Sequence, residues 1–274
     1  MQMVYNVVRG GAAVNVLARH AGSRVVVIDM GVHTNLEKHP DLIIKKIGYG
    51  TNNIAQGPAM SKKEAVASIE AGIEVFKTEY NKSKGIDIIG TGEMGIGNTT
   101  SSAAIASVIT GKSIEDITGR GTGVDDDGLA RKIAIIKKAI LINAPLAGDA
   151  VDVLSKVGGF EIGGLAGVIL AAADEKIPVV IDGFISTAAA LIAFTLKPEV
   201  KEYMIAAHCS HEKGHRLMLE YIGLKPLLDL DMHLGEGTGA ALGMSIIEAS
   251  IKILTEMETF QSAGVSERMD KESS

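Results

Sequence analysis

Apolar residues along the chain form two kinds of pattern, short continuous runs and longer stretches with helical spacing. Continuous runs rich in β-branched residues predict buried strands, and they occur at residues 24–29, 42–47, 86–89, 179–182 and 203–207. Apolar residues three and four positions apart predict helices. These run from the first residues to a stop at Gly22, then over 61–80, 99–110, 125–142, 149–157, 161–173, 185–196, 211–221 and 238–259. Alternating strands and helices indicate an α/β fold with a mostly parallel sheet covered by helices.

Composition narrows the class of protein. The 274 residues include 27 Lys+Arg and 33 Asp+Glu, and the resulting net charge of −6 argues against a general nucleic-acid binder. A single cysteine allows no internal disulfide and favours a reducing cytoplasm. Apolar runs such as Val168–Ala173 and Ala188–Ala193 are far shorter than a membrane span of about 20 residues, and the N-terminus lacks a signal-peptide pattern. Glycine is in excess, with 32 residues where average composition gives about 19.

The most informative glycine-rich turn is GTGEMGIGNTT at 90–100, directly after a predicted strand. Glycines let the main chain approach an anion, and the next helix offers free N–H groups beside the hydroxyls of Thr99 and Thr100. The turn fits the dinucleotide pattern poorly because Asn98 delays the helix, and it lacks the Gly-Lys-Ser/Thr of a P-loop. Glu93 is unusual in a loop that only binds phosphate. A tight turn without a ligand is the alternative.

A second glycine-rich turn, LGEGTGAAL at 234–242, precedes the last predicted helix. Glycines on both sides of Glu236 leave its carboxylate unshielded, and a carboxylate facing a helix N-terminus is stabilised by about 0.3–1 kcal/mol. Burial beside an apolar ligand would raise its pKa towards that of a useful general base. Simple capping of the last helix is the alternative.

A third motif, TGRGTGVDDDG at 118–128, allows two interpretations. Asp125–Asp127 could hold Mg²⁺, but acidic residues at a helix start also complement the helix dipole, and we favour the latter. Lys132, one helical turn later, is either a lysine whose stem packs on apolar neighbours or a phosphate contact.

A fourth motif, AHCSHEKGH at 207–215, contains His211 and His215 at i, i+4. These could share zinc with Cys209, but a structural zinc site needs four ligands and the second pair is missing. We therefore expect Ser210 to cap a helix, which also leaves N–H groups free for an anion. Two other turns complete the set. We interpret the glycines of 158–167 as close helix packing, whereas Gly183 follows a strand and fits a ligand loop.

Taken together and in this order, the motifs GTGEMGIGNTT, SKVGGFEIGGLAGVILAA, VVIDGFISTAAAL, HCSHEKGH and LGEGTGAAL resemble those of the nicotinate-nucleotide–dimethylbenzimidazole phosphoribosyltransferases, which act in cobalamin lower-ligand synthesis. The resemblance covers about residues 3–260. It implies a Rossmann-like domain over residues 23–222, a small helical domain from 1–22 and 223–260, and a homodimer. The polar residues 261–274 are expected to form a flexible tail.

The resemblance also implies the reaction and its residues. Phosphoribose would pass from nicotinate mononucleotide to dimethylbenzimidazole or a related base, giving α-ribazole 5′-phosphate with inversion at C1′, and no cofactor or resident metal is implied. Glu236 would be the catalytic base, and Glu93 would lie near the ribose and the base. The implied substrate-binding residues are Gly95, Gly97, Asn98, Thr99, Thr100, Gly121, Lys132, Gly183, Ser210 and Gly237.

Members of this family carry further residues before the position of Met1, and the first predicted helix begins without a capping residue. We therefore expect the small domain and the base pocket to be incomplete in this chain. Two other functions stay open: a Mg²⁺-dependent, diphosphate-using phosphoribosyltransferase built on Asp125–Asp127, and a truncated nucleotide-binding module without activity. The natural base is also open.

Overall fold

The computed structural model describes residues 1–83, 85–121 and 123–265. Its strands are β1 (Val27–Asp29), β2 (Leu42–Ile44), β3 (Ile89–Gly90), β4 (Val179–Ile181), β5 (Met204–Ala206), β6 (His208–Ser210) and β7 (Leu228–Met232). Its α-helices are α1 (Gln2–Val8), α2 (Ala13–His20), α3 (Lys62–Lys82), α4 (Asn98–Thr110), α5 (Ile114–Ile117), α6 (Asp126–Asn143), α7 (Ala150–Val157), α8 (Phe160–Asp174), α9 (Phe184–Leu196), α10 (His215–Ile222) and α11 (Thr238–Glu256). A 3₁₀-helix, η1, covers Pro198–Tyr203.

Neighbouring strands pair in parallel, which confirms the predicted α/β class. β4 lies in the middle of a three-stranded ladder in the order β3-β4-β5, while β1 pairs with β2 and β6 with β7. In register, Val179 of β4 lies opposite Ile89 on one side and Met204 on the other. The turns after β3 and β4 therefore leave the same edge of the ladder, where parallel α/β sheets bind their ligands.

Helices cover both faces of the central ladder, as predicted. Side chains alternate along a strand, so Val179 and Ile181 join the large core beneath α8 and α9. Val180 points the other way and packs with Ala207 and with Ala240 of α11. All three β4 side chains are buried, and this explains why the strand is apolar without alternation.

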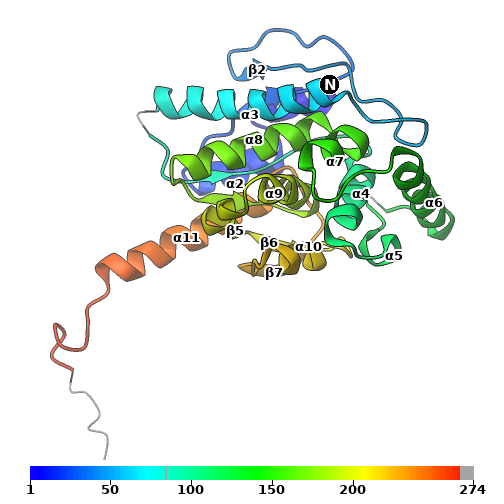
Figure 1. Cartoon of the computed structure of the whole chain (residues 1–274). Coiled ribbons are helices and arrows are strands. Elements are labelled where there is room, and N and C mark those ends of the chain that lie inside the picture. The colour runs from blue at the N-terminus through cyan, green and yellow to red at the C-terminus, as the bar shows by residue number, and fades with distance from the viewer. Residues whose placement is uncertain (84, 122, 266–274) are drawn as a thin grey trace, which may run out of the picture.

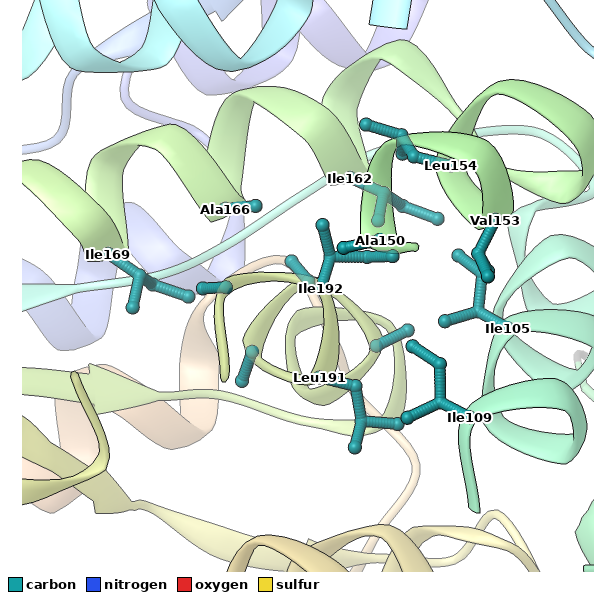
Figure 2. Close-up of a cluster of buried hydrophobic side chains, with 14 of the residues drawn as sticks. Ile105, Ile109, Ala150, Val153, Leu154, Ile162, Ala166, Ile169, Leu191 and Ile192 are labelled. Carbon is teal, nitrogen blue, oxygen red and sulfur yellow. The ribbon is translucent and has the colours of Figure 1, made fainter. Parts of the chain in front are cut away.

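The main core fills the space between α4, α7, α8 and α9. Figure 2 shows the side chains that meet there, and each of the labelled residues is at most 6% exposed, for example Ile105 of α4 and Leu191 of α9 at 0%. Truncating one of these isoleucines or leucines to alanine costs about 2–5 kcal/mol.

Glycines bring α3 and α8 into backbone contact, and the two helices run side by side in Figure 1. A Cβ added to Gly72 of α3 would lie 1.9 Å from the Gly164 carbonyl oxygen, and one added to Gly167 would lie 2.0 Å from the Ile69 carbonyl oxygen. Within 158–167, Gly163 and Gly167 thus serve close helix packing, as predicted, whereas a Cβ added to Gly158 or Gly159 would meet Leu154 or Glu161 instead.

The single helix predicted at the N-terminus is wrong, because the structure has α1 and α2 there. Gly10 has a φ of +78°, which takes the chain out of the helical conformation between Val8 and Ala13. Adjacent glycines break the helix, although apolar spacing continues across them. The predicted stop at Gly22 is confirmed, since α2 ends at His20 and Gly22 has a φ of +63°.

The helix predicted over 211–221 begins only at His215, because residues 208–210 form β6. The prediction missed β6, which is too short and polar for periodicity to reveal, and it missed its partner β7. It also missed the short α5. Strands predicted over 24–29 and 86–89 are reduced to Val27–Asp29 and Ile89–Gly90.

α11 extends away from the body of the molecule in Figure 1. It ends at Glu256 rather than at the predicted residue 259. By length and composition alone it could cross a membrane, although its first residues, including Ala240 and Ala241, are buried against the sheet. Of the tail predicted over 261–274, residues 266–274 lie outside the described residues.

Candidate functional site

Two glycine-rich turns meet at the edge of the central ladder. The first joins β3 to α4, and the second joins β7 to α11. A Cβ added to Gly92 in the first turn would lie 2.7 Å from the Glu236 carbonyl oxygen and 2.9 Å from Gly237 Cα. The backbones are therefore in contact, and only glycine fits. This contact brings Glu93 and Glu236, 143 residues apart in the numbering of the chain, to one site.

Glu236 has an unusual backbone conformation. Its φ is +66°, in the left-handed region that non-glycine residues rarely adopt, and Gly237 follows at +93°. Such conformations are held by the surrounding structure and concentrate at functional sites. Burial, reinforced by the charge of Asp182, raises the pKa of the half-buried Glu236 side chain. A raised pKa suits a carboxylate that accepts a proton near neutral pH.

Asp182, directly after β4, holds the Glu236 turn in place. One carboxylate oxygen, Oδ2, accepts the Gly237 N–H at 3.1 Å, and the other accepts the Ala240 N–H at 2.9 Å. The Asp182 N–H donates in turn to Thr91 Oγ1 at 3.1 Å. The acidic cap of α11 is thus Asp182. The interpretation in which Glu236 caps this helix is wrong, because two N–H groups at its N-terminus already point at a buried carboxylate.

Glu93 lies in a group of carboxylates. Burial raises its pKa to about 7; the hydrogen bond from Asn98 opposes this, while the charges of Glu161, Asp182 and Glu236 raise it further. Asn98 Nδ2 donates directly to Glu93 Oε2. Burial also raises the pKa of Glu161, in the first turn of α8. Mutual repulsion in such a group favours the uptake of a proton or a cationic ligand.

Groups that could bind an anion lie beside these carboxylates, at the N-terminus of α4. Lys132 Nζ donates to Thr99 Oγ1 at 2.9 Å and to the Gly119 carbonyl at 3.2 Å. A Cβ added to Gly121 would lie 3.2 Å from Thr99 Oγ1 and 3.4 Å from Lys132 Nζ, so the loop passes close to both. Burial lowers the pKa of Lys132, and the charge of Glu212 opposes this. A half-buried lysine beside a helix N-terminus fits a phosphate contact rather than a solvated side chain.

Ser210 and Gly183 form the third part of the site. The position of a Cβ on Gly183 lies 3.8 Å from Ser210 Cβ, and Ser210 Oγ is buried without a partner among the described residues. The expectation that Ser210 caps a helix is wrong, because α10 begins after Gly214 and has no side-chain cap. The Ser210 N–H instead donates to His215 Nδ1 at 2.9 Å. Its hydroxyl is therefore available to a ligand.

His215 is structural. Its Nδ1 accepts from Ser210, and its Nε2 lies 2.8 Å from Thr187 Oγ1, which donates to the Gly183 carbonyl. Nε2 therefore carries the proton. Burial lowers the pKa of His215 to about 3, so the ring is neutral. Both ring nitrogens are in use, and the zinc site considered for Cys209, His211 and His215 does not form.

Asp125 caps α6, accepting the Gly128 N–H at 2.7 Å, and Asp126 pairs with Arg120. This confirms the preferred interpretation of the acidic run as a helix start.

The predicted site residues thus fall into three adjoining groups. Around the carboxylates lie Glu93, Glu236, Gly95, Asn98 and Gly237. Around the α4 N-terminus lie Gly97, Thr99, Thr100, Gly121 and Lys132. Just after β4 lies Gly183, and at the end of β6 lies Ser210. The groups are joined by the consecutive pairs Asn98–Thr99 and Asp182–Gly183.

Sequence reasoning missed Glu161 and Asp182. Asp182 carried a usable signal, since it is a carboxylate at the carboxyl end of a buried strand, where ligands bind in α/β folds. For Glu161 the sequence gives no indication of a functional role beyond its position between two glycine pairs. Its approach to Glu93 depends on how α8 packs.

Similar proteins of known name or structure all indicate the same family. A family model described as Phosphoribosyltransferase matches residues 1–265. The chain is 59% identical over 266 residues, covering 97% of this chain and 75% of the other, to a protein of Desulforudis audaxviator named nicotinate-nucleotide–dimethylbenzimidazole phosphoribosyltransferase. A protein of the same name from Roseiflexus sp. is 57% identical, with 98% and 76% covered. The crystal structure of CobT from Thermus thermophilus superposes with a TM-score of 0.93 at 44% identity, covering 97% of this chain and 79% of that one.

Proposed function

This chain belongs to the nicotinate-nucleotide–dimethylbenzimidazole phosphoribosyltransferase family, and from that premise we propose that Glu236 and Glu93 carry out its reaction. The enzyme transfers phosphoribose from nicotinate mononucleotide to dimethylbenzimidazole. The observation that supports the two residues most directly is the contact of Gly92 with the Glu236 backbone, which leaves both carboxylates at one site.

Glu236 acts as the general base. The attacking base carries an imidazole ring, one nitrogen of which attacks C1′ while the other carries a proton. As the new bond forms, Glu236 accepts that proton, and the bond from C1′ to nicotinate breaks with its electron pair going to the pyridine nitrogen. Attack on the face opposite the leaving group inverts the configuration at C1′. The raised pKa of Glu236 makes it basic enough for this task.

Glu93 stabilises positive charge. The pyridinium of nicotinate mononucleotide is cationic, and positive charge spreads onto the ribose as the C1′–N bond breaks. A buried carboxylate attracts that charge more strongly than a solvated one. The charge of a cationic ligand would also favour the ionised form of Glu93, whose pKa burial raises to about 7.

The phosphate of the mononucleotide is bound by Lys132, Thr99, Thr100 and Ser210. The lysine supplies charge, and the backbone N–H groups of the first α4 turn supply directed donors. Binding the phosphate away from the reacting carbon turns remote affinity into alignment of C1′ with the attacking nitrogen.

The termini support a second proposal, a small helical domain and a homodimer. α2 packs on α11, as expected of a unit built from both chain ends. The second half of α11 exposes apolar side chains, including Ile251, Ile253 and Leu254, which a second copy would cover. Sedimentation equilibrium tests the dimer.

We also propose a cytoplasmic location, consistent with the single free cysteine, Cys209.

The test of the catalytic base is Glu236→Gln. We expect kcat to fall by about 10²–10⁴ while the KM for nicotinate mononucleotide stays nearly unchanged, because only proton transfer is lost. Glu248→Gln, an exposed glutamate on the same helix paired with Lys252, is the matched control and should keep full activity. Product formation is followed with nicotinate mononucleotide and a panel of bases. Normal turnover in Glu236→Gln would show that Glu236 is not the catalytic base.

A further inference from the structure

Three side chains with metal-binding atoms meet on the surface beside the Glu236 turn. His211 follows β6, while Asp231 and His233 lie at the end of β7 and just after it. One ligand atom from each of the three lies within 4.8 Å of the others. All three side chains are exposed, at 61%, 75% and 64%, so an ion can reach them from solvent.

The backbone builds this arrangement. β6 and β7 pair in parallel, with Ser210 opposite Met232, and the His211 N–H continues the pairing by donating to the Met232 carbonyl at 3.3 Å. His211 is thereby placed beside the two residues that flank Met232. Asp231 has a φ of +50°, a left-handed conformation in which the strand does not continue regularly. At this irregular backbone position the Asp231 carboxylate lies near both histidines.

The side-chain geometry goes beyond an ordinary surface ion pair. His211 Nδ1 lies 2.8 Å from Asp231 Oδ1, and His233 Nε2 lies 3.7 Å from Asp231 Oδ2. The two imidazole rings lie close together and tilted, with centroids 4.2 Å apart and planes at 33°. Two imidazolium ions would repel each other at this spacing, whereas two neutral imidazoles and one carboxylate are the donors that borderline first-row metals prefer.

We propose that His211, Asp231 and His233 form a site for a divalent transition-metal ion of the Zn²⁺ type, with three protein ligands and one position open to water. Exposed side chains can move the short distance from their present spacing to coordination bonds. The ion would join the end of β6, next to Ser210, to the segment that leads into Glu236 three residues later. It would therefore stiffen the Glu236 turn from outside the substrate site.

The experiment is a titration of the untagged full chain with Co²⁺, whose visible absorption reports four-coordinate nitrogen and oxygen ligands. We expect one equivalent to bind and Zn²⁺ to displace it. His211→Gln and His233→Gln should each weaken binding by about tenfold or more, since even partners outside the coordination shell are worth about 10–100-fold. His39→Gln is the control, because His39 faces a single carboxylate, Asp41, at 3.7 Å.

A second measurement separates binding from general effects on folding. Saturating Zn²⁺ should raise the melting temperature of the wild type and of His39→Gln, but not of His233→Gln. Circular dichroism confirms that each variant is folded. Absence of stoichiometric Co²⁺ binding by the wild type, or equal binding by the wild type and both cluster variants, would overturn the proposal.

Discussion

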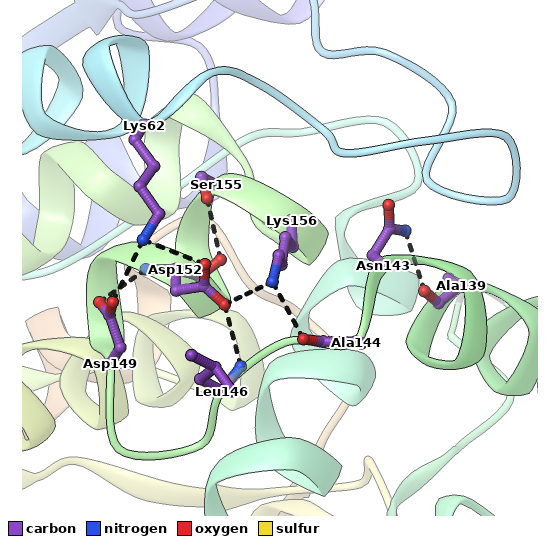
Figure 3. Close-up of polar contacts among 9 residues, drawn as sticks. All are labelled: Lys62, Ala139, Asn143, Ala144, Leu146, Asp149, Asp152, Ser155 and Lys156. Carbon is purple, nitrogen blue, oxygen red and sulfur yellow. Dashed lines mark hydrogen bonds and ion pairs between the residues drawn. The ribbon is translucent and has the colours of Figure 1, made fainter.

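Replacing Asp152 by asparagine tests how a buried carboxylate stabilises this fold. Figure 3 shows Asp152 on α7 between two lysines. Its Oδ2 accepts from Lys156 Nζ at 2.8 Å and from the Leu146 N–H at 2.9 Å, while Oδ1 lies 3.1 Å from Lys62 Nζ. Burial alone would raise the pKa of Asp152, but these partners outweigh it and lower the pKa to about 2.

The magnitude follows from the difference between the two pKa values. Going from 3.8 to about 2 corresponds to about 2.4 kcal/mol, at 1.36 kcal/mol for each pKa unit. The Lys62 side chain is 59% exposed, and solvent screening weakens its share. We therefore expect Asp152→Asn to lower the free energy of unfolding by about 1–2 kcal/mol at pH 7.

The sign of the pH dependence follows from linkage. The folded pKa lies below the unfolded pKa, so this stabilisation is fully present above the unfolded value and is lost as pH falls towards the folded value. The difference between wild type and variant should stay constant from neutral pH to about pH 5, then shrink as pH falls towards about 2. Urea unfolding followed by circular dichroism measures it, with Asp87→Asn, an exposed aspartate, as the control.

Two results would refute the reasoning. Equal stability of wild type and Asp152→Asn at pH 7 would mean that desolvation cancels the ion pairs. A difference that persists unchanged at low pH would mean that the variant loses packing or hydrogen bonding rather than charge.

Three further predictions concern the site and its support. Lys132→Ala should raise the KM for nicotinate mononucleotide by about 10–100-fold with little change in kcat, because a charge-assisted hydrogen bond to phosphate contributes about 1.5–3 kcal/mol; an unchanged KM would indicate a solvated lysine. In the wild type, kcat/KM should fall as pH drops below about 7, where Glu93 takes up a proton, and Glu93→Gln should lower the rate and leave only the dependence due to the general base Glu236; a profile unaltered by the variant would assign it to another group. Gly72→Ala should destabilise the fold by about 1–3 kcal/mol or more, since the added Cβ would lie 1.9 Å from a carbonyl oxygen of α8, while Gly57→Ala, with open space around it, should be tolerated in thermal unfolding.

Local patterns in the sequence were sufficient to predict most elements of the fold. The apolar run at 179–182 predicted β4 because a strand buried on both faces carries no polar positions. Helices with clear starts were also predicted well: Ser61 and Glu64 form the capping box of α3, with the Glu64 N–H donating to Ser61 Oγ. Predicted helix and strand boundaries were wrong where the contact that fixes them is distant in sequence. An example is β6, which forms because it pairs with β7.

The sequence by itself determined which residues could do chemistry. Glycine-flanked glutamates and a lysine among apolar residues can be recognised in the sequence, because each motif spans only about ten residues. The backbone freedom that glycine gives is also a local property. Only the tertiary structure decided which of these groups meet. Glu93 and Glu236 converge because Gly92 lets two backbones touch, and Asp182 caps α11 because β4 ends beneath it. The approach of Glu161 to Glu93 and of His211 to His233 depends in the same way on packing between distant segments, and such contacts leave no periodic trace in the chain.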